Sequence, residues 1–300
     1  MSDSPLISIV LPTYNGSRYL ADAVESIRRQ TYLNWELLLQ DDCSTDGTPD
    51  LIARLATTDS RIKPGRNATN LRLPNSLNAG FERAQGEFLT WTSDDNEHRP
   101  EALKEMLAIL RQDAGCGLVY CDMLSIDDEG RSLGSWRAPE PDQLGWVNSV
   151  GACFLYRREV AETVGRYDDR WRLVEDWDYW LRVARRYRLR VLHRELYLYR
   201  RHAASLTTTR AQEIQRIQME MLAVRLPDLP GLNAKVRALS YLKLARSAAA
   251  LGEGERAREF NSRAWELDWW QTAVVLAGRR LLGADRAGAI RNRLRRRPRH

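Results

Sequence analysis

The chain has few cysteines and no long apolar segment. Four of its 300 residues are cysteines, and Cys43, Cys116, Cys121 and Cys153 form no CxxC pair, so we expect packed, reduced thiols rather than disulfides or a zinc site. No apolar run approaches the ~20 residues of a membrane-spanning helix, and residues 1–6 lack the basic start and apolar stretch of a secretory signal. Because 43% of the residues are hydrophobic, we expect a cytoplasmic globular protein with a sizeable core.

Motifs for specific nucleic-acid binding are also lacking, although the formal net charge is +6. Much of the excess lies at the end, where residues 291–300 hold six arginines and no acid. Such a run binds anionic lipid headgroups at roughly 1 kcal/mol per basic residue, binds nucleic acid nonspecifically, or stays solvated. We favour a solvated tail or a peripheral contact with the inner face of the cell membrane over specific nucleic-acid binding.

The first half of the chain alternates strand and helix patterns. Short β-branched or apolar runs predict strands, and the amphipathic stretches between them predict helices. The predicted strands are residues 7–11, 35–40, 61–63, 88–91 and 118–121, and the predicted helices are 18–29, 48–57, 73–85 and 100–111. This order predicts an α/β fold with a mostly parallel central sheet flanked by helices, in which ligands bind beyond the carboxyl ends of the strands.

The second half begins irregularly and then becomes helical. Residues 126–142 are polar and contain glycine and proline, which predicts a hairpin or loop over the sheet. Short helices are predicted at 157–164 and 176–186, an extended segment at 189–199, and later helices at 213–226, 233–251, 254–267 and 270–282. We therefore expect an α/β domain over residues 1–209 and an all-helical C-terminal extension with a basic tail over 210–300. The last helix, with Trp269 and Trp270 before a basic end, could also lie in a membrane interface.

Two adjacent carboxylates, Asp94 and Asp95, follow the strand predicted at residues 88–91. Hard divalent cations such as Mg²⁺ and Mn²⁺ take oxygen ligands, and one or two carboxylates often hold them together with the phosphates of a substrate. The pair therefore indicates a metal site for a nucleotide-linked substrate. The alternative is that these acids cap the helix predicted at residues 100–111.

Further motifs follow the other strands and open one of the helices. They are Pro12-Thr13-Tyr14-Asn15-Gly16, Gln40-Asp41-Asp42-Cys43-Ser44-Thr45-Asp46-Gly47, Asn75-Ser76-Leu77-Asn78-Ala79-Gly80, Ser93-Asp94-Asp95-Asn96 and Val174-Glu175-Asp176-Trp177-Asp178. In order and spacing, over residues 6–206, the chain resembles the family-2 glycosyltransferases. The resemblance implies a GT-A type nucleotide-binding fold over residues 1–209. It also implies a metal-dependent transfer of a sugar from a nucleotide-sugar donor, with inversion.

For the donor, the resemblance implies that the nucleoside of a UDP- or dTDP-sugar lies against the ends of the first two strands. Pro12, Tyr14 and Asn15 belong to a turn whose backbone and amide can hydrogen-bond a base or ribose, and Asp42 can accept from a base N–H. Asp46 is expected mainly to cap the helix that follows. Asn78 has two open interpretations. Either it lets its helix approach the donor closely, or its amide bridges two loops.

By the same resemblance, Asp94 and Asp95 hold Mg²⁺ or Mn²⁺ on the diphosphate, and Asp94 also contacts the nucleotide sugar. Many family members have a further Asp two positions before Asp94, where this chain has Thr92. The resemblance suggests His202 as a metal ligand or a diphosphate contact. A single histidine after a strand is, however, often a packing or surface residue.

On the acceptor side, the position of Asp176 in its motif implies the general base, which removes a proton from the acceptor hydroxyl as that oxygen attacks the anomeric carbon. The alternative is a helix cap, because acids favour helix starts. Gly151, in a segment of small residues, and Glu175 are expected near a glycan or lipid-linked acceptor. Asp178 has the weaker prospect of an ion pair with Arg182, four residues on.

Two other functions are alternatives. A nucleotidyltransferase also combines a metal with an α/β sheet, but it would normally show a Gly-rich loop where this chain has residues 12–16. A non-catalytic scaffold or binding module would use the helical extension to recruit partners, and the joint presence of Asp94, Asp95 and Asp176 argues against it. The Gln-x-x-Arg-Trp motif and membrane spans of processive synthases are missing, so we expect a nonprocessive enzyme of cell-surface polysaccharide or glycoconjugate biosynthesis.

Overall fold

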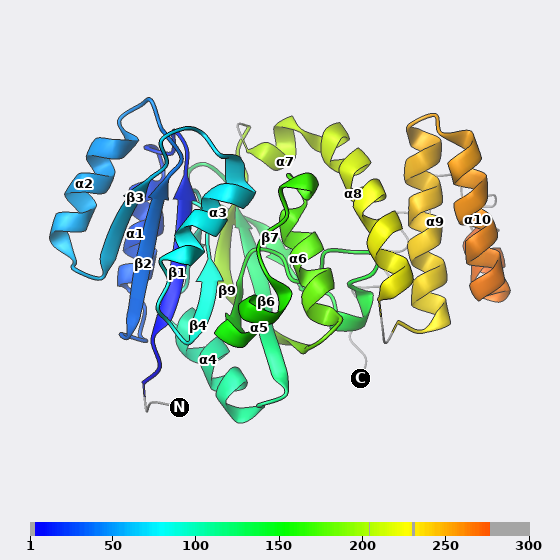
Figure 1. The fold of residues 1–300 in the computed structure, drawn as a ribbon, viewed down its shortest axis with the longest axis horizontal. Coiled ribbons are helices and arrows are strands. Elements are labelled where there is room, and N and C mark those ends of the chain that lie inside the picture. The colour runs from blue at the N-terminus through cyan, green and yellow to red at the C-terminus, as the bar shows by residue number, and fades with distance from the viewer. Residues whose placement is uncertain (1–3, 204, 230–231, 277–300) are drawn as a thin grey trace.

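The computed structural model describes residues 4–203, 205–229 and 232–276. Within these ranges it shows a nine-stranded mixed sheet with helices on both faces, followed by helices that lie beyond one end of the sheet (Figure 1). The strands are β1 (Ile7–Thr13), β2 (Trp35–Asp41), β3 (Ile62–Arg66), β4 (Phe88–Trp91), β5 (Glu97–His98), β6 (Cys116–Ile126), β7 (Ser132–Trp136), β8 (Phe154–Arg157) and β9 (Arg188–Arg200). The α-helices are α1 (Leu20–Arg28), α2 (Thr48–Thr58), α3 (Arg72–Glu82), α4 (Ala102–Gln112), α5 (Arg158–Val164), α6 (Glu175–Ala184), α7 (Leu206–Thr209), α8 (Ala211–Arg225), α9 (Ala234–Ala250) and α10 (Gly254–Leu267).

The strand order is β3-β2-β1-β4-β8-β6-β9-β5, with β7 paired to β6. Strands β1, β2, β3, β4, β6 and β9 run in one direction, and β5, β7 and β8 are antiparallel to their neighbours. The predicted α/β fold with a mostly parallel sheet is therefore confirmed. The predicted loop over residues 126–142 begins with the hairpin of β6 and β7.

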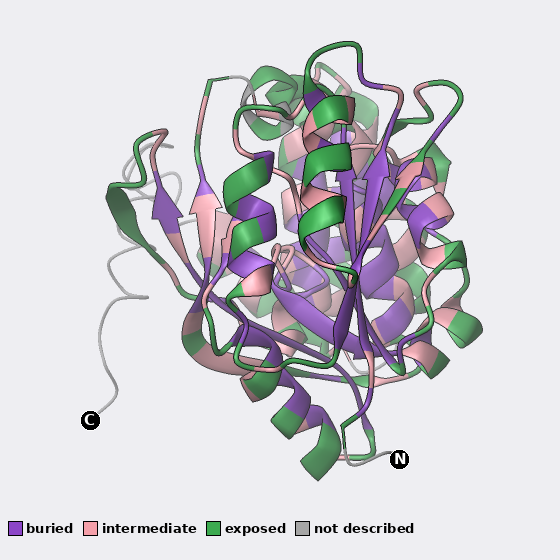
Figure 2. Ribbon diagram, turned by 90° about the vertical axis from the view of Figure 1, so that its left-hand side faces the viewer, coloured by how far each residue is buried: buried purple, intermediate pink, exposed green. Residues whose placement is uncertain are grey.

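The core lies on both faces of the sheet because the central strands are apolar on both sides. Strands β1 and β2 are buried along their whole length, as Figure 2 shows for most of the sheet. Successive strand side chains point to opposite faces. Ile9 and Leu37 accordingly pack in a cluster with α1 and α4, while Val10 and Leu38 pack in a cluster with α3 and α6.

Some strands differ from their predicted bounds. The prediction for β3 ended at residue 63, yet the strand continues through Pro64 and Gly65. β3 lies at the edge of the sheet, where one side has no partner strand and a proline is tolerated. β5 has two residues, too few for any periodic pattern to reveal.

The C-terminal helices share a core with the sheet. The cluster around Val10 and Trp177 continues into Met219 and Leu222 of α8 and Leu242 of α9. Apolar packing therefore crosses the predicted domain boundary at residues 209 and 210, and that boundary stays a prediction. Residues 269–276 are helical, and the rest of the predicted helix 270–282, like the basic tail, lies outside the described residues.

Within the described residues, no helix is both long and apolar enough to cross a membrane.

Candidate active site

The loops that follow β1 and β2 are tied together at one edge of the sheet. The parallel register places Thr13 opposite Asp41 at the ends of these strands. Beyond them, the backbone N–H of Asn15 donates to Ser44 Oγ at 2.9 Å, and the N–H of Thr45 donates to Asn15 Oδ1 at 2.8 Å. Asn15 therefore joins the two loops that are expected to hold the nucleoside.

Pro12 and Tyr14 flank Thr13 and differ in exposure. Pro12 is buried in β1. Its ring nitrogen faces the side of β4, but the pairing of β1 with β4 ends earlier, at Val10 and Trp91. The missing N–H of this proline therefore removes no hydrogen bond between the strands. Tyr14 is 48% exposed. Pro12 thus shapes the strand end and Tyr14 offers a ring at the surface of this edge, while a nucleotide contact by either residue stays a prediction.

Backbone strain concentrates in the same loops. Among the described residues, the non-glycine residues with positive φ are Asn15 (54°), Cys43 (64°), Arg72 (68°) and Leu173 (78°). Each costs roughly 1–2 kcal/mol. Asn15 follows β1 and Cys43 follows β2, while Arg72 opens α3 and Leu173 precedes α6. Each therefore lies in or near one of the motifs found in the sequence. Such strain persists where surrounding contacts hold it, and it gathers at functional sites.

The Asp42 carboxylate holds the loop before α3. Its Oδ1 accepts from Asn67 Nδ2 at 2.7 Å and from the N–H of Leu71 at 2.8 Å, and its Oδ2 accepts from the N–H of Arg72 at 2.9 Å. The side chain is only 4% exposed. Its observed role is to order residues 67–72 at the edge of the sheet, and its contact with a base stays a prediction.

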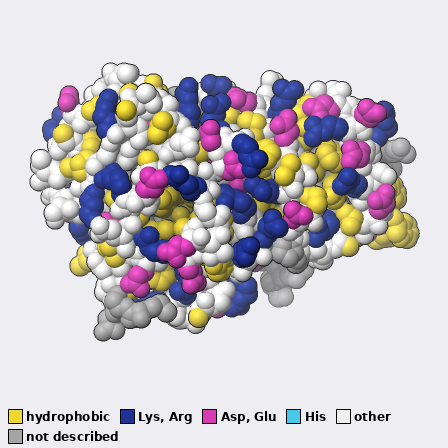
Figure 3. All heavy atoms as spheres, viewed as in Figure 1, with side chains coloured by type: hydrophobic (Ala, Val, Ile, Leu, Met, Phe, Trp, Pro, Cys, Tyr) yellow, Lys and Arg dark blue, Asp and Glu magenta, His cyan; other side chains and the backbone are white. Residues whose placement is uncertain are grey.

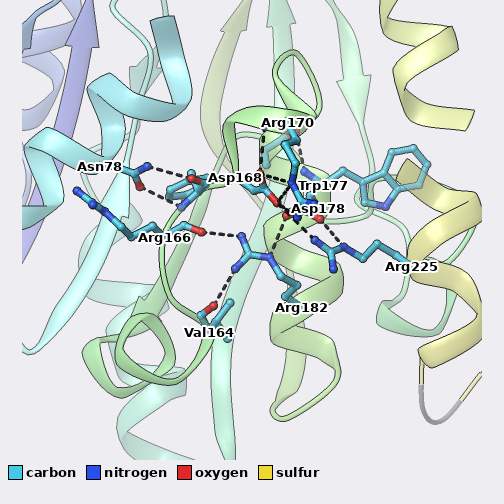
Figure 4. A network of polar contacts seen from close by, with 11 residues as sticks. Asn78, Val164, Arg166, Asp168, Arg170, Trp177, Asp178, Arg182 and Arg225 are labelled. Atoms are coloured by element: carbon cyan, nitrogen blue, oxygen red, sulfur yellow. Dashed lines mark hydrogen bonds and ion pairs between the residues drawn. The ribbon is translucent and has the colours of Figure 1, made fainter. Parts of the chain in front are cut away.

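Asp46 and Asn78 both make structural contacts. Asp46 Oδ1 accepts from the N–H of Thr48, the first residue of α2, at 3.0 Å, although the N-cap of this helix is Gly47 and not Asp46 as predicted. Asn78 Nδ2 donates to the carbonyl of Tyr167, and its Oδ1 accepts from the N–H of Tyr167, both at 2.9 Å (Figure 4). The structure thus supports the second interpretation of Asn78. Its amide bridges α3 to a distant loop, and its contact with the nucleotide sugar stays a prediction.

Asp94 is held against the end of β1. Thr13 Oγ1 donates to Asp94 Oδ2 at 2.5 Å. A Cβ on Gly16 would lie 1.9 Å from the same oxygen, so only glycine leaves room for this carboxylate. Burial raises the pKa of Asp94 to about 6; the hydrogen bond from Thr13 opposes this shift, and the charge of Asp95 adds to it.

Asp95 and His202 come together although 107 residues separate them. Asp95 Oδ2 lies 3.0 Å from His202 Nε2, while Asp95 Oδ1 is buried with no hydrogen-bond partner within the described residues. The ring of Tyr19 packs 5.5 Å from the His202 ring, and Arg200 Nε donates to the Asp95 carbonyl at 3.1 Å. An open hollow of about 320 Å³ lies beside His202, between the β6–β7 turn and residues 201–203.

The donor atoms of this cluster suit a hard cation. In the ranges that the structure describes, no group of three or more His, Cys, Asp or Glu side chains is arranged to hold a metal ion. The buried oxygen Asp95 Oδ1, which lacks a partner, is nevertheless the kind of ligand that Mg²⁺ and Mn²⁺ take, and Asp94 adds further oxygens. Metal binding by Asp94, Asp95 and His202 stays a prediction.

Helix α6 begins at Glu175 and carries the second acidic pair. Val174 is its N-cap, and no side chain caps the helix there. Asp176 Oδ2 accepts from Asn148 Nδ2 at 2.8 Å, and Asp176 Oδ1 accepts from the N–H of Trp177 at 2.7 Å. Burial raises the pKa of Asp176. The carboxylate is therefore held in one orientation by a residue from a different loop.

Glu175 is more deeply buried than its neighbour. It is 4% exposed, and its Oε2 has no hydrogen-bond partner within the described residues. Burial raises the pKa of Glu175 to about 8, and the charge of Asp176 contributes. Two adjacent acids in a low-dielectric site ionise one after the other, so at pH 7 Glu175 is protonated.

This difference predicts how stability depends on pH. Between the ordinary pKa of glutamate, 4.5, and the folded value of about 8, the folded state holds a proton that the unfolded state has lost, so stability falls as pH rises. Glu175→Gln removes this contribution. Urea unfolding at pH 5 and pH 8 should show the wild type losing stability relative to the variant, by at most about 1.4 kcal/mol per pH unit. A difference between the two proteins that does not change with pH would contradict the assignment.

Gly151 and Asp178 serve packing and ion pairing. Gly151 has φ +66°, a backbone conformation that strains any other residue, and a Cβ there would also lie 2.9 Å from Met123 Cε, which would have to shift. An acceptor contact near Gly151 stays a prediction. Asp178 is fully buried, and Arg182 Nε donates to its Oδ2 at 2.9 Å, which confirms the predicted ion pair.

An aromatic chain joins the strand that leads to Asp94 with the helix that carries Asp176. Trp91 Nε1, at the end of β4, donates to the Tyr167 hydroxyl at 2.9 Å. The Tyr167 ring stacks on Tyr179 of α6, with centroids 4.2 Å apart. Packing therefore couples the two acidic clusters.

Three residues of the site were missing from the expected set. Thr13 and Gly16 lie within the motif of residues 12–16, so the motif itself was a usable signal. Asn148 has no local signal, because its partner Asp176 is 28 residues away in sequence.

The chain matches the model of a known protein family. The family described as glycosyl transferase family 2 matches residues 8–165, more than half of the chain. EpsE of Bacillus subtilis (strain 168), named as a glycosyltransferase, is 36% identical over 194 residues, which are 61% of this chain and 68% of EpsE. TuaG of the same strain, named for teichuronic acid biosynthesis, is 30% identical over 137 residues, 45% of this chain and 54% of TuaG.

Solved structures share the fold. TarS 1–349 of S. aureus in complex with UDP-GlcNAc superposes with a TM-score of 0.66 at 18% identity, covering 86% of this chain and 81% of that one. The mannosyltransferase PcManGT of Pyrobaculum calidifontis, in complex with GDP-Man and Mn²⁺, superposes with a TM-score of 0.65 at 18% identity, covering 92% and 79%. The GT-A fold predicted from the motifs is therefore confirmed.

The match of the family model over more than half of the chain and the GT-A fold define the class of protein. This chain belongs to glycosyl transferase family 2. It is accordingly a glycosyltransferase, rather than the nucleotidyltransferase or scaffold considered as alternatives.

Proposed function

We propose that this glycosyltransferase moves a sugar from a UDP- or dTDP-sugar to an acceptor hydroxyl in a single displacement that inverts the anomeric carbon. The observation that carries the proposal is the pair Glu175 and Asp176 at the start of α6, a buried and a half-buried acid whose pKa values are raised by loss of contact with water. A general base works best when its pKa lies near the operating pH. Because Glu175 is protonated at pH 7, Asp176 is the member of the pair that accepts a proton.

In the proposed reaction, Asp176 takes the proton of the acceptor hydroxyl as that oxygen attacks the anomeric carbon. The new C–O bond forms on the face opposite the diphosphate, the sugar–phosphate bond breaks, and the nucleoside diphosphate leaves with the electron pair. Asn148 and the N–H of Trp177 each occupy one lone pair of the Asp176 oxygens. The remaining lone pairs are available for the incoming proton.

Asp94 and Asp95, with His202 beside them, would hold Mg²⁺ or Mn²⁺ at the donor diphosphate. The cation would offset the negative charge that develops on the leaving nucleoside diphosphate. Pro12, Tyr14, Asn15 and Asp42 would line the nucleoside, at the edge where β1 and β2 end. A nucleotide sugar accompanies this fold in both solved neighbours, and Mn²⁺ accompanies it in PcManGT.

A donor screen tests the proposed reaction. We expect release of nucleoside diphosphate from UDP- or dTDP-sugars when Mn²⁺ or Mg²⁺ is present, and much less from GDP-sugars. Proton NMR of the product should show the opposite anomeric configuration from the donor. A preference for GDP-sugars would contradict the donor class, and retention of configuration would contradict the single displacement.

The proposed acceptor is a glycan or a lipid-linked saccharide in cell-surface polysaccharide biosynthesis. The name of TuaG, which refers to teichuronic acid biosynthesis, supports this setting. Glu175 and Gly151 would lie on the acceptor side.

We also propose that the protein is cytoplasmic and contacts the inner face of the membrane through its C-terminal end. Trp269 and Trp270, just after α10, are 64% and 60% exposed. Figure 3 shows hydrophobic side chains gathered at the lower right, at the carboxyl end of α10. Exposed tryptophans followed by six arginines in residues 291–300 suit an anionic lipid surface, where rings enter the interface and cations meet headgroups.

Vesicle sedimentation tests this contact. The protein should bind vesicles that contain phosphatidylglycerol and should bind pure phosphatidylcholine vesicles far less. Replacing Trp269 and Trp270 together with alanine should weaken binding several-fold, because the apolar part of the contact is lost. Leu33→Ala, at a side chain that is 70% exposed in another part of the chain, is the matched control and should bind normally. Equal binding to both kinds of vesicle, or to neither, would contradict the proposal.

A further inference from the structure

An arginine of the C-terminal helices reaches the helix that carries Asp176. Arg225 of α8 donates from Nε to Asp178 Oδ1 at 2.6 Å, and Asp178 lies two residues after Asp176 in α6. Figure 4 shows Arg182 and Arg225 approaching Asp178 from two helices. Because Asp178 is fully buried, the two guanidinium groups replace the water contacts that its carboxylate has lost. This ion pair fixes α8 against the acid-bearing helix.

Lys243 of α9 is another cation of the C-terminal helices, and it lies between α6 and a loop. Its Nζ donates to the carbonyl of Trp146 at 2.8 Å and sits 4.4 Å from the centroid of the Trp177 ring. Burial and the charge of Arg246 lower the pKa of Lys243 to about 8. The carbonyl and the ring face compensate in part for the water that the ammonium group has lost.

The loop that Lys243 contacts, residues 144–149, is held from both sides. Trp177 Nε1 donates to the carbonyl of Leu144 at 2.9 Å, which ties the loop to α6. At Gly145, a Cβ would lie 2.7 Å from Leu232 Cδ1 and 3.3 Å from Ser240 Oγ, so the backbone is pressed against the C-terminal region. This same loop carries Asn148, whose amide holds Asp176.

We propose that Lys243 is a positioning residue for transfer, because it fixes the loop of residues 144–149 so that Asn148 holds the Asp176 carboxylate in its reactive orientation. The C-terminal helices are thereby part of the acceptor side of the site. This inference rests on the proposed role of Asp176 as the base. A carboxylate displaced by about 1 Å can lose on the order of 10²-fold in rate.

The test compares turnover with donor binding. Lys243→Met should lower kcat, measured as release of nucleoside diphosphate from the donor that the screen identifies, by roughly 10- to 100-fold. The Kd for UDP, measured by calorimetry with Mn²⁺, should stay within about twofold of the wild type, because the donor loops lie on other elements. Lys243→Arg keeps a cation and N–H donors and should recover most of the turnover. Lys235→Met, the same change at an exposed position of α9, should behave as wild type.

A double-mutant cycle separates positioning from general support of the fold. If Lys243 acts through Asn148, the double variant Lys243→Met with Asn148→Ala should have a kcat little lower than that of the slower single variant. Additive losses, unchanged kcat in Lys243→Met, or a parallel loss of UDP affinity would overturn the inference. Full turnover in Asp176→Asn would instead overturn the proposed base. Loss of turnover in Asp176→Asn with normal turnover in Lys243→Met would overturn only the role of Lys243.

Discussion

Asp176→Asn is expected to lower turnover by roughly 10²–10⁴-fold while UDP binding stays nearly unchanged. The amide of the new asparagine has almost the shape of the Asp176 carboxylate. Its hydrogen bond with Asn148 can persist if the Asn148 amide turns over to present its oxygen. The new amide cannot, however, take the proton of the acceptor hydroxyl. The loss should therefore appear in kcat. Steady-state kinetics with the identified donor and calorimetric titration with UDP measure the two quantities separately.

Asp169→Asn is the matched control for this result. Asp169 is an exposed acid in the short 3-10 helix Asp169–Trp171, close to α6 in sequence, and the same substitution there should leave kcat unchanged. Normal turnover in Asp176→Asn would remove this residue from the reaction. Equal losses at Asp169 and Asp176 would show that the effect is not specific to the base.

Asp95→Asn is expected to produce the second large effect, on donor binding and on turnover together. In the wild type, Mn²⁺ should tighten UDP binding, because the cation would bridge Asp94, Asp95 and the diphosphate. The variant would lose one charged ligand of the proposed cation, because the buried oxygen Asp95 Oδ1 would become part of a neutral amide or be replaced by the amide nitrogen. Turnover should fall by on the order of 10³-fold, which corresponds to the several kcal/mol that a metal ion supplies.

Calorimetry with UDP, with and without Mn²⁺, gives a readout that does not depend on turnover. The Mn²⁺-dependent gain in UDP affinity should disappear in Asp95→Asn and persist in Asp22→Asn, a change at an exposed acid of α1. If Mn²⁺ does not change the affinity of the wild type for UDP, the cation does not join the diphosphate to these carboxylates.

The order of strands and helices in the first half could be read from local patterns. The buried strands β1, β2 and β4 are short apolar runs, and each is followed by an amphipathic segment, so hydrophobic periodicity was sufficient to find them. The edge strand β3 was predicted too short because Pro64 and Gly65 disfavour strands in general but are tolerated at an edge. β5 could not be predicted, since its two residues form a strand only by pairing with β9.

The candidate site was predictable where a single motif contains the signal. Asp94, Asp95 and the Glu175–Asp176 pair were identified from their positions after a strand and at a helix start. The role of Asn78 was not decided by its motif, because its amide could serve a ligand or a loop, and its contact with Tyr167, 89 residues later, is visible only in the folded structure.

The sequence by itself indicated the family, the order of the parallel strands β1 to β4 and the residue types at their carboxyl ends, because these depend on local periodicity and on motifs within short segments. Only the tertiary structure decided which of these groups meet. Asn148 lies against Asp176, His202 against Asp95, and Lys243 against the carbonyl of Trp146, 97 residues away. These contacts arise when separate elements pack into a shared core, and the burial that follows raises the pKa of Glu175 to about 8. No local pattern encodes them, since each depends on two segments that are brought together only when the chain is folded.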